Sequence, residues 1–292
     1  MRVAIVGATG TIGRPLVAAL SLEHDVVGVA RRPPGTTQDR VDWIAADATD
    51  IAAVRRALDG ADVVYHLVHS LGSGDFEALD RAAAAAVADG AAAGGARQIV
   101  YLGGLGESGA DLSAHLRSRA ETAKILESGT VPVTTLRAAM IVGPGSAAFE
   151  TILALVDRLP VMVCPRWVSV ETQPVALRDV LAALAGVGGT EATYGQTYDL
   201  GGPEIMTYRT MMERVARIRG KHPVLIEVPF LTPRLSSLWL YLVTPASVDV
   251  ARPLVEGLRI PTVAKDGRIW ELLDVKPTTF DEAIRLALLE GA

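Results

Sequence analysis

Three glycines near the start of the chain constrain its fold more than any other feature. An apolar run over residues 3–6, rich in β-branched side chains, precedes Gly7, Gly10 and Gly13, and residues 15–20 have the composition of a helix. A strand, a glycine-rich turn and a helix in this order bind the pyrophosphate of a dinucleotide. We therefore expect a bound dinucleotide, and a glycine-rich turn without a ligand is the alternative.

Each glycine has a physical role in such a turn. One permits the tight turn out of the strand, a second lets the backbone approach the pyrophosphate, and the third lets the helix pack closely on the strand. The helix N-terminus then offers free N–H groups and the positive end of its dipole to the phosphates. The contacts expected from this segment are Gly7, Thr9, Gly10, Thr11, Ile12 and Gly13.

The first half of the chain alternates predicted strands and helices, which indicates a Rossmann-like α/β fold with a doubly wound parallel sheet. The predicted strands are 3–6, 25–30, 41–45, 63–67, 98–102 and 133–137. The predicted helices are 11–22, 51–58, 76–93 and 112–128.

The pattern changes after residue 140, where Gly143, Pro144 and Gly145 mark a break. We expect a dinucleotide-binding domain over residues 1–145, with contributions from about 170–202, and a small, mostly helical C-terminal lobe over residues 146–292. The elements expected beyond the break are helices at 149–159, up to 184 and at 208–219, and strands from 173 and at 197–200. A final helix opens after Thr279, and Glu282 three residues on completes the spacing of a capping box.

Charge and cysteine content exclude several classes of protein. The 292 residues carry a net charge of −5 with both signs interspersed. The absence of a basic stripe argues against nucleic acid as a partner. Cys164 is the one cysteine and has apolar neighbours, so we expect a buried packing residue, and we predict no metal site.

We expect neither a targeting signal nor a membrane span in this sequence. A core strand is expected from residue 2 onward, which leaves no room for a signal peptide and favours a cytoplasmic location. The uncharged stretch 235–248 is too short to span a bilayer. We expect a buried or interface helix there, and contact with a membrane surface or a protein is the alternative.

Two arginines at the end of the second predicted strand favour NADP over NAD. NAD-selective sites place a carboxylate there to bind the ribose 2′-hydroxyl. This chain has Arg31 and Arg32 instead, and a guanidinium can bind a 2′-phosphate through two hydrogen bonds. In the alternative, with NAD, these arginines solvate the sheet edge or stack on the adenine.

The spacing G-x-x-G-x-x-G of Gly7, Gly10 and Gly13 resembles the extended and atypical branches of the short-chain dehydrogenase/reductase superfamily. The resemblance implies further cofactor contacts. Asp47 and Ala48, after the third strand, match the acidic position at the adenine edge, although Asp47 can instead cap the following helix. The end of the fourth strand would line the ribose and pyrophosphate through Leu67 and Val68, with His69 as a polar group in the cleft.

The catalytic pattern of that superfamily is only partly present. The superfamily places Ser or Thr at the end of the fifth strand and Tyr-x-x-x-Lys on one face of the next helix. Lys lowers the Tyr pKa, so that the phenol can exchange a proton as hydride moves. Here the Ser/Thr place holds Gly103 and Gly104, and His115 and Arg119 take the places of Tyr and Lys. The candidate catalytic residues are therefore His115 and Arg119, and in the alternative this helix only supports the cofactor.

Further matches extend the resemblance over about residues 1–220. The run from Ser128 to Arg137 is similar to that of the NmrA-like group, in which Glu121 and Arg137 would form a polar pair. The segments 115–119 and 165–167 resemble an uncharacterised subgroup related to the NAD(P)-binding accessory subunit of respiratory complex I. The resemblance implies an NADP-dependent oxidoreductase or isomerase of an apolar small molecule. A non-catalytic dinucleotide-binding redox sensor or assembly factor is the alternative.

Overall fold

The computed structural model describes residues 1–35, 39–70, 73–106, 112–228 and 259–291. Within this part of the chain, seven parallel strands form one sheet in the order β11-β6-β5-β4-β1-β2-β3. The strands are β1 (Arg2–Val6), β2 (Asp25–Ala30), β3 (Val41–Ala45), β4 (Val63–His66), β5 (Gln98–Gly104), β6 (Val133–Ala138) and β11 (Thr197–Leu200). The strand order reverses between β1 and β4, which is the point where doubly wound sheets bind ligands. The predicted Rossmann-like fold is confirmed.

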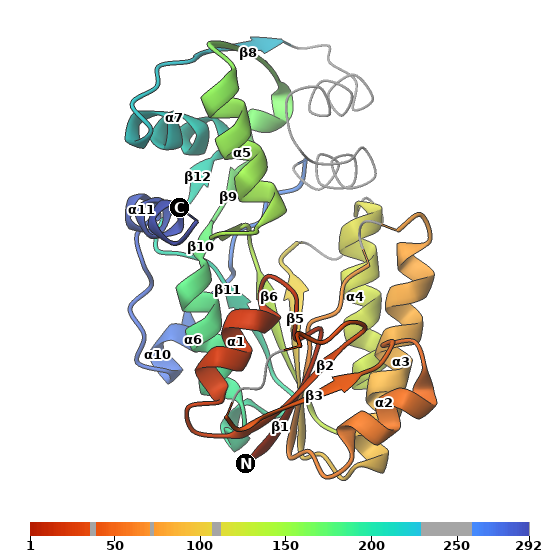
Figure 1. Cartoon of the computed structure of the whole chain (residues 1–292). Helices are drawn as coiled ribbons and strands as arrows, with labels where there is room; N and C mark the ends of the chain where they lie inside the picture. The colour runs from red at the N-terminus through yellow and green to blue at the C-terminus, as the bar shows by residue number, and fades with distance from the viewer. Residues whose placement is uncertain (36–38, 71–72, 107–111, 229–258, 292) are drawn as a thin grey trace.

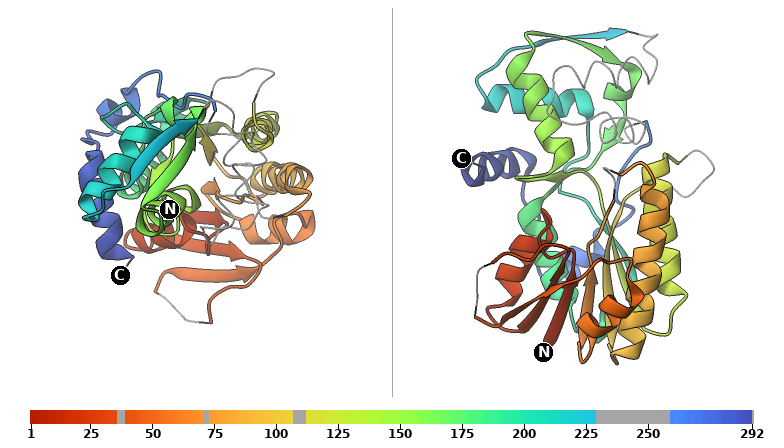
Figure 2. Two further views of the ribbon diagram at one scale, coloured as in Figure 1. Left: turned by 90° about the horizontal axis from the view of Figure 1, so that it is seen from above. Right: turned by 45° about the vertical axis from the view of Figure 1, so that its right-hand side comes forward.

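Helices cover both faces of this sheet, and the two layers can be followed in Figures 1 and 2. One face carries α1 (Gly13–Leu20) and α6 (Leu177–Val187), with α10 (Arg268–Leu272) beside β11. The other face carries α2 (Ile51–Leu58), α3 (Phe76–Ala93) and α4 (Ala114–Glu127). Parallel strands covered in this way are buried on both sides.

Strand β1 shows how the apolar run produces two cores. Val3 and Ile5 point into the core beneath α1 and α6. Ala4 and Val6 point into the core beneath α2 and α3. Because side chains alternate along a strand, a strand between two helical layers needs apolar residues at every position.

Several element ends differ from the prediction. Helix α1 begins at Gly13 rather than residue 11, because the turn is closed by a hydrogen bond from the Gly10 N–H to the Gly7 carbonyl oxygen at 3.0 Å. Helix α4 begins after Ser113, whose Oγ accepts a hydrogen bond from the Leu116 N–H. Strand β5 continues two residues past its predicted end, as far as Gly104, because β6 still pairs with it there.

The lobe lies beyond the carboxyl ends of the strands, as Figure 1 shows. Its core contains Phe149, Met211 and Ile284. Cys164 is buried in the same core, as expected. The helices of the lobe are α5 (Ala147–Arg158), α7 (Tyr208–Ile218) and α11 (Phe280–Glu290), with the short 3-10 turn η1 (Arg166–Ser169). A second 3-10 turn, η2 (Glu191–Thr193), lies at the other end of the sheet, where Thr193 is hydrogen-bonded to Gln98 and Thr134.

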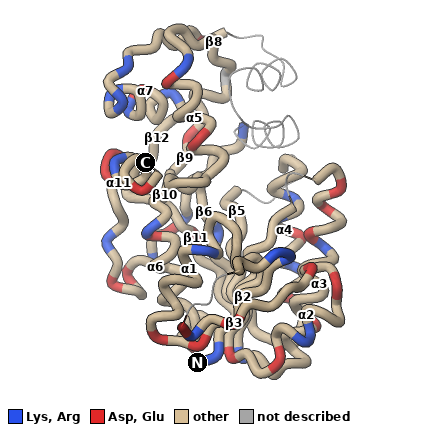
Figure 3. The backbone as a smooth tube through the Cα atoms, viewed as in Figure 1, with Lys and Arg blue, Asp and Glu red and all other residues tan. Residues whose placement is uncertain are grey.

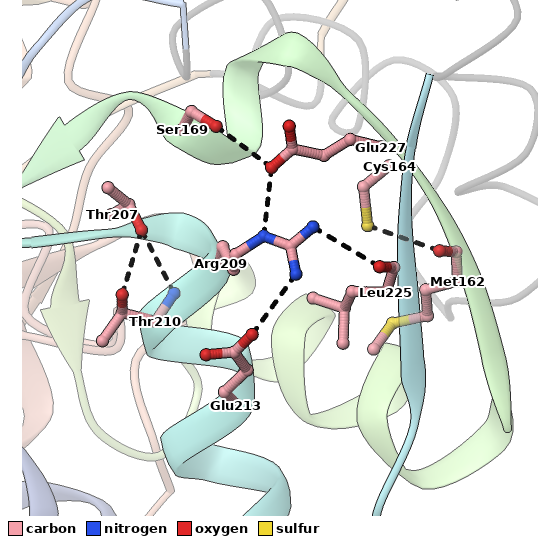
Figure 4. A network of polar contacts seen from close by, with 9 residues as sticks. All are labelled: Met162, Cys164, Ser169, Thr207, Arg209, Thr210, Glu213, Leu225 and Glu227. Carbon is pink, nitrogen blue, oxygen red and sulfur yellow. Dashed lines mark hydrogen bonds and ion pairs between the residues drawn. The ribbon is translucent and has the colours of Figure 1, made fainter.

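Sequence reasoning predicted the strand from residue 173, seen as β10 (Val175–Ala176), but missed the other short strands outside the seven-stranded sheet. Strands β8 (Val161–Pro165) and β13 (Val224–Val228) pair in parallel, so the described part of the lobe is not only helical. The other short strands are β7 (Ile141–Val142), β9 (Glu171–Thr172) and β12 (Met206–Thr207). Arg209 on α7 joins that helix to β13 through Glu227 at 3.0 Å and the Leu225 carbonyl oxygen at 3.4 Å (Figure 4).

The predicted helix at 235–248 falls outside the described residues. None of the described helices combines the length and apolar character needed to cross a membrane. Acidic and basic residues are mixed over the backbone in Figure 3, in agreement with the interspersed charges of the sequence. The domain boundary near residue 145 stays a prediction.

Candidate functional site

A cleft of about 500 Å³ lies at the carboxyl ends of β1, β2, β3 and β4. It spans the switch point between β1 and β4, where the doubly wound architecture predicts a ligand. Six of the predicted contacts on the glycine turn and after β4 line this cleft: Gly7, Thr9, Gly10, Leu67, Val68 and His69. The fold therefore brings these distant segments together as expected.

The glycine turn leaves no room for larger residues. Gly7 has φ of +94°, a conformation that favours glycine. A Cβ at Gly13 would lie 2.2 Å from the Gly7 carbonyl oxygen. Gly13 is therefore needed for the close approach of helix α1 to the turn, and it is buried rather than exposed to the cleft.

Two predicted contacts lie beside the cleft rather than in its lining. The Thr11 Oγ1 donates a hydrogen bond to the Gly145 carbonyl oxygen at 3.2 Å. Ile12 packs against the core beneath α1. These two residues therefore fix the turn to the segment that leads into the lobe and to the sheet.

Arg31 and Arg32 are exposed where β2 ends, and both line a hollow that continues from the cleft. Arg31 also lines the cleft itself. Among the described residues, neither guanidinium forms an ion pair or a hydrogen bond. Both guanidiniums can therefore bind a ligand anion without first breaking such a contact.

Asp47 and Ala48 line the cleft after β3. The Asp47 carboxylate accepts hydrogen bonds from the Thr49 N–H at 2.9 Å and the Thr49 hydroxyl at 2.7 Å. The Thr49 backbone bond is the main cause of the lowered Asp47 pKa. Helix α2 is capped instead by Asp50, which accepts a hydrogen bond from the Ala53 N–H. Asp47 is thus not the cap of α2, which leaves its carboxylate at the cleft.

The residues present fit a dinucleotide. The turn after β1 has the positive φ and the tight helix approach that pyrophosphate binding requires, and the adjoining hollow carries two cations where a 2′-phosphate would lie. The far side of the cleft is formed by residues after β4 and by Leu79 and Ala83 of α3. Leu67, Val68 and Leu79 contribute apolar side chains to the lining.

Three side chains form a hydrogen-bonded chain at one end of the cleft, next to the segment that follows β4. The Asp80 carboxylate on α3 lies 2.9 Å from His69 Nδ1, and His69 Nε2 lies 3.0 Å from His115 Nδ1 on α4. Asp80 also accepts hydrogen bonds from the Ser70 N–H at 2.9 Å and the Ser118 hydroxyl at 2.8 Å. We call this arrangement the Asp80–His69–His115 chain.

Burial sets the protonation of these groups. Burial opposes the ionisation of Asp80, but hydrogen bonds from His69, Ser118 and the Ser70 N–H outweigh it and lower the pKa of Asp80 to about 2. Burial lowers the pKa of His69, and burial together with the nearby His69 and Arg119 lowers the pKa of His115 to about 3. The carboxylate is therefore charged and both imidazoles are neutral near pH 7.

Arg119 occupies a different position from the cleft residues. Its guanidinium donates a hydrogen bond to the Leu102 carbonyl oxygen of β5 and lies 5.1 Å from the centre of the Tyr101 ring. It lines a separate cavity of about 90 Å³ together with Gly103 and Gly104. The structure therefore brings His115, but not the Arg119 guanidinium, into contact with a residue of the cleft.

Sequence reasoning missed Asp80, which contacts both His69 and Ser118. The sequence did contain a signal for Asp80, because it places a carboxylate on the face of an alanine-rich helix that is turned toward the sheet. Arg137 was expected to pair with Glu121, but it pairs with Asp199 at 2.6 Å, and Glu121 pairs with Arg81 at 3.1 Å. The expected pair is wrong because the Arg137 guanidinium is directed toward β11.

Comparison with known families agrees with this geometry. Residues 7–151 match the model of a family described as NAD(P)H-binding. This part of the chain, which contains the glycine turn and the cleft, is therefore a dinucleotide-binding domain. The match to the NAD(P)H-binding family agrees with the predicted resemblance to the atypical short-chain dehydrogenase/reductase superfamily.

Three curated relatives illustrate the similarity. An uncharacterised protein of Mycobacterium tuberculosis is 46% identical over 81 residues, which are 27% of this chain and 10% of that protein. The (4-alkanoyl-5-oxo-2,5-dihydrofuran-3-yl)methyl phosphate reductase of Streptomyces griseus is 29% identical over 74% of this chain and 73% of its own length. Ceramide reductase of Caulobacter vibrioides is 29% identical over 78% and 73%, respectively.

Solved structures share the fold over the whole chain. A nucleoside-diphosphate-sugar epimerase of Staphylococcus aureus has a TM-score of 0.78 at 14% identity and covers 98% of this chain and 100% of its own. The NADPH-dependent quinone oxidoreductase of Escherichia coli, solved with NADPH, has a TM-score of 0.77 at 21% identity and covers 97% and 98%. At these identities the likeness concerns the fold alone.

Proposed function

We propose that this chain is an NADP-dependent oxidoreductase that interconverts a hydroxyl and a carbonyl group on an apolar small molecule. One observation carries the proposal. A single cleft has the glycine turn and Arg31 along one side and His69 on the other, and His69 is bonded to His115. His115 takes the place of the Tyr that exchanges a proton in the superfamily.

The relatives support the type of reaction. Both relatives that match about three quarters of this chain are named reductases, and one of them acts on a compound with an alkanoyl group. A reductase needs a hydride donor and a group that exchanges a proton with the substrate oxygen. The family match supplies the first requirement, and His115 is our candidate for the second.

Each group of residues has its own task in the proposed mechanism. The glycine turn would hold the pyrophosphate, Arg31 and Arg32 would hold the 2′-phosphate, and Leu67 and Val68 would contact the ribose. The dinucleotide, when bound, supplies or accepts the hydride. His115 exchanges the proton of the substrate oxygen, and Arg119, fixed on the Leu102 carbonyl oxygen, contributes positive charge nearby.

Turnover measurements test the proposal. The purified chain is offered NADPH with a panel of ketones and aldehydes, and NADP⁺ with the matching alcohols, while absorbance at the nicotinamide band is followed. We expect turnover that falls about 100-fold or more in His115→Ala, the range for loss of a general acid or base. His222→Ala is the matched control, since His222 is exposed outside the cleft. Equal turnover in wild type and His115→Ala would contradict the role of His115.

A non-catalytic dinucleotide-binding protein is the second candidate. The observation that favours it is the loss of the Ser, Tyr and Lys positions, with glycine at 103 and 104 and the Arg119 guanidinium bound to the Leu102 carbonyl oxygen. This candidate predicts tight NADPH binding, followed by fluorescence, without turnover of any compound of the panel. Turnover above the rate of His115→Ala would exclude it.

A further inference from the structure

The Asp80–His69–His115 chain determines which nitrogen of each imidazole carries a hydrogen. An ionised carboxylate only accepts hydrogen bonds, so His69 Nδ1, 2.9 Å from Asp80, must donate. A neutral imidazole has one N–H, and His69 Nε2 is therefore an acceptor. His115 Nδ1, 3.0 Å from that atom, must then donate in turn.

The consequence for His115 is that its Nε2 atom carries a lone pair. Among the described residues no hydrogen bond uses this atom, and the ring is half-buried rather than sealed in the core. A free imidazole can carry its hydrogen on either nitrogen. Here the tautomer of His115 is set from Asp80, two hydrogen bonds away.

We propose that Asp80 and His69 are positioning residues that hold His115 in the Nδ1–H tautomer, so that His115 Nε2 accepts the proton of a substrate hydroxyl. This inference rests on the proposed oxidoreductase function and adds a direction to it. With both imidazoles neutral, the Asp80–His69–His115 chain can accept a proton, which is what the oxidation of an alcohol by NADP⁺ requires. Carbonyl reduction requires that it first take up one proton.

In the proposed step one proton and one hydride leave the alcohol. The hydroxyl O–H bond would break and its proton would go to His115 Nε2. The C–H bond of the carbon that bears the hydroxyl would break as well, its hydrogen leaving as a hydride that a bound NADP⁺ would accept, and a C=O bond would form. The Asp80–His69–His115 chain then has one extra proton, which the Asp80 carboxylate stabilises through His69 and which is later released to water. Reduction by NADPH is the reverse, and it consumes that proton.

The charged and titratable groups around the two rings agree with this direction. Arg119 on α4 and the buried His66 on β4 face them, and Asp80 on α3 is the one carboxylate bonded to either ring among the described residues. Glu77 on α3 is paired with Arg117 on α4 at 3.5 Å. Burial and the positive charge of Arg119 both disfavour protonation of His69 and His115, so the neutral form of both imidazoles is favoured at neutral pH.

The hydrogen bonds of Asp80 allow the tautomer of His115 to be tested by a single substitution. Its Oδ1 accepts from the Ser70 N–H, a backbone group that cannot reverse its role. In Asp80→Asn the amide oxygen must remain at that position, which places the amide NH₂ against His69 Nδ1. His69 must then accept at Nδ1 and donate at Nε2, so His115 must accept at Nδ1 and carry its hydrogen on Nε2.

Nitrogen NMR of ¹⁵N-histidine-labelled protein without cofactor measures these tautomers directly, with signals assigned through His69→Gln and His115→Gln. We expect the Nδ1–H form for both His69 and His115 at pH 7.5. Asp80→Asn is expected to move His115 to the Nε2–H form, and Ser118→Ala, which keeps the carboxylate, is expected to leave it unchanged. An Nε2–H form of His115 in the wild type overturns the proposal.

Two further measurements complete the test. If Asp80→Asn does not fold, His69→Phe removes the acceptor for His115 Nδ1, and a His115 that still keeps the Nδ1–H form would contradict the proposal. In turnover, we expect Asp80→Asn to lower kcat for alcohol oxidation about 100-fold with KM nearly unchanged. The wild-type rate of reduction should rise toward acid pH while that of oxidation falls. If no compound is turned over, the proposed function fails, while the tautomers of the unliganded protein still decide the inference.

Discussion

Arg137 on β6 and Asp199 on β11 form an ion pair of 2.6 Å, although 62 residues separate them in the sequence. Asp199 is buried, and its second oxygen accepts a hydrogen bond from the Lys265 N–H at 3.0 Å. The pair therefore joins the last two strands of the sheet to a segment near the C-terminus. Removal of the buried Asp199 carboxylate would leave the partly exposed Arg137 guanidinium unpaired and the Lys265 N–H without its acceptor.

We expect Asp199→Ala to lower the free energy of unfolding by about 2 kcal/mol, measured by urea denaturation, because water partly solvates the Arg137 guanidinium that remains. Glu121→Ala is the matched control, because Glu121 pairs with Arg81 at an exposed site, where ion pairs contribute little. A control variant as unstable as Asp199→Ala would show that the burial of the pair is not what matters.

The coenzyme preference is expected to depend on Arg31 and Arg32. Each guanidinium can donate two hydrogen bonds to a 2′-phosphate, so Arg31→Ala and Arg32→Ala should raise the Kd of NADPH about tenfold each. The Kd of NADH, which has no such phosphate, should change by less than threefold. Fluorescence titration of both dinucleotides measures the ratio, and equal affinity of the wild type for NADPH and NADH would exclude the NADP preference.

A methyl group on Gly13 should disrupt the turn. A Cβ at this position would lie 2.2 Å from the Gly7 carbonyl oxygen and 2.8 Å from Ala8 Cα, so the backbone must move. We expect Gly13→Ala to lower the free energy of unfolding by about 2 kcal/mol and to weaken NADPH binding by tenfold or more. Gly267→Ala, whose nearest contact is 3.8 Å away, is the control and should change neither quantity appreciably.

Acid should destabilise the fold through His66. Burial is the main cause that lowers the pKa of His66 to about 3, and neither ring nitrogen has a hydrogen-bond partner among the described residues. Between pH 6.5 and pH 3 the unfolded chain binds a proton at His66 that the folded chain does not, so stability falls as the pH falls.

The expected size of this effect follows from the linkage. Between pH 6.5 and pH 5 the wild type should lose about 2 kcal/mol more than His66→Phe, which keeps an aromatic ring against Tyr101 but cannot take up a proton. Urea denaturation at the two pH values measures the difference. Parallel losses in both proteins would show that His66 does not contribute.

Local patterns predicted the dinucleotide-binding half of the fold. Residues 25–30, 41–45, 51–58 and 76–93 form their predicted elements, because apolar runs, glycine breaks and alanine-rich stretches are local signals. The cleft residues followed from the same elements, since parallel strands present their carboxyl ends at one edge of a sheet. The roles of these residues in binding and catalysis stay predictions.

Long-range polar contacts were not predictable from the sequence. The final helix starts after Thr279 as expected, but the capping box is wrong, because Thr279 makes no side-chain cap bond. Glu204 instead accepts from the Phe280 N–H, and Asp179 accepts from the Thr278 N–H and hydroxyl. Asp80 is a similar case, since its partners come from the segment after β4 and from α4, and no local spacing relates them.

The position of β11 has a consequence for dissecting the protein. The chain completes β6, leaves to build α5 and β8, and only then returns to add the edge strand β11, with α6 covering the β1 face on the way. A fragment ending near residue 151, where the family match stops, would lose α6 and expose Leu136 and Val100, which are buried in the intact protein. Exchange of the lobe with that of a relative therefore requires two junctions, one on each side of an insertion, and a simple C-terminal graft will not suffice.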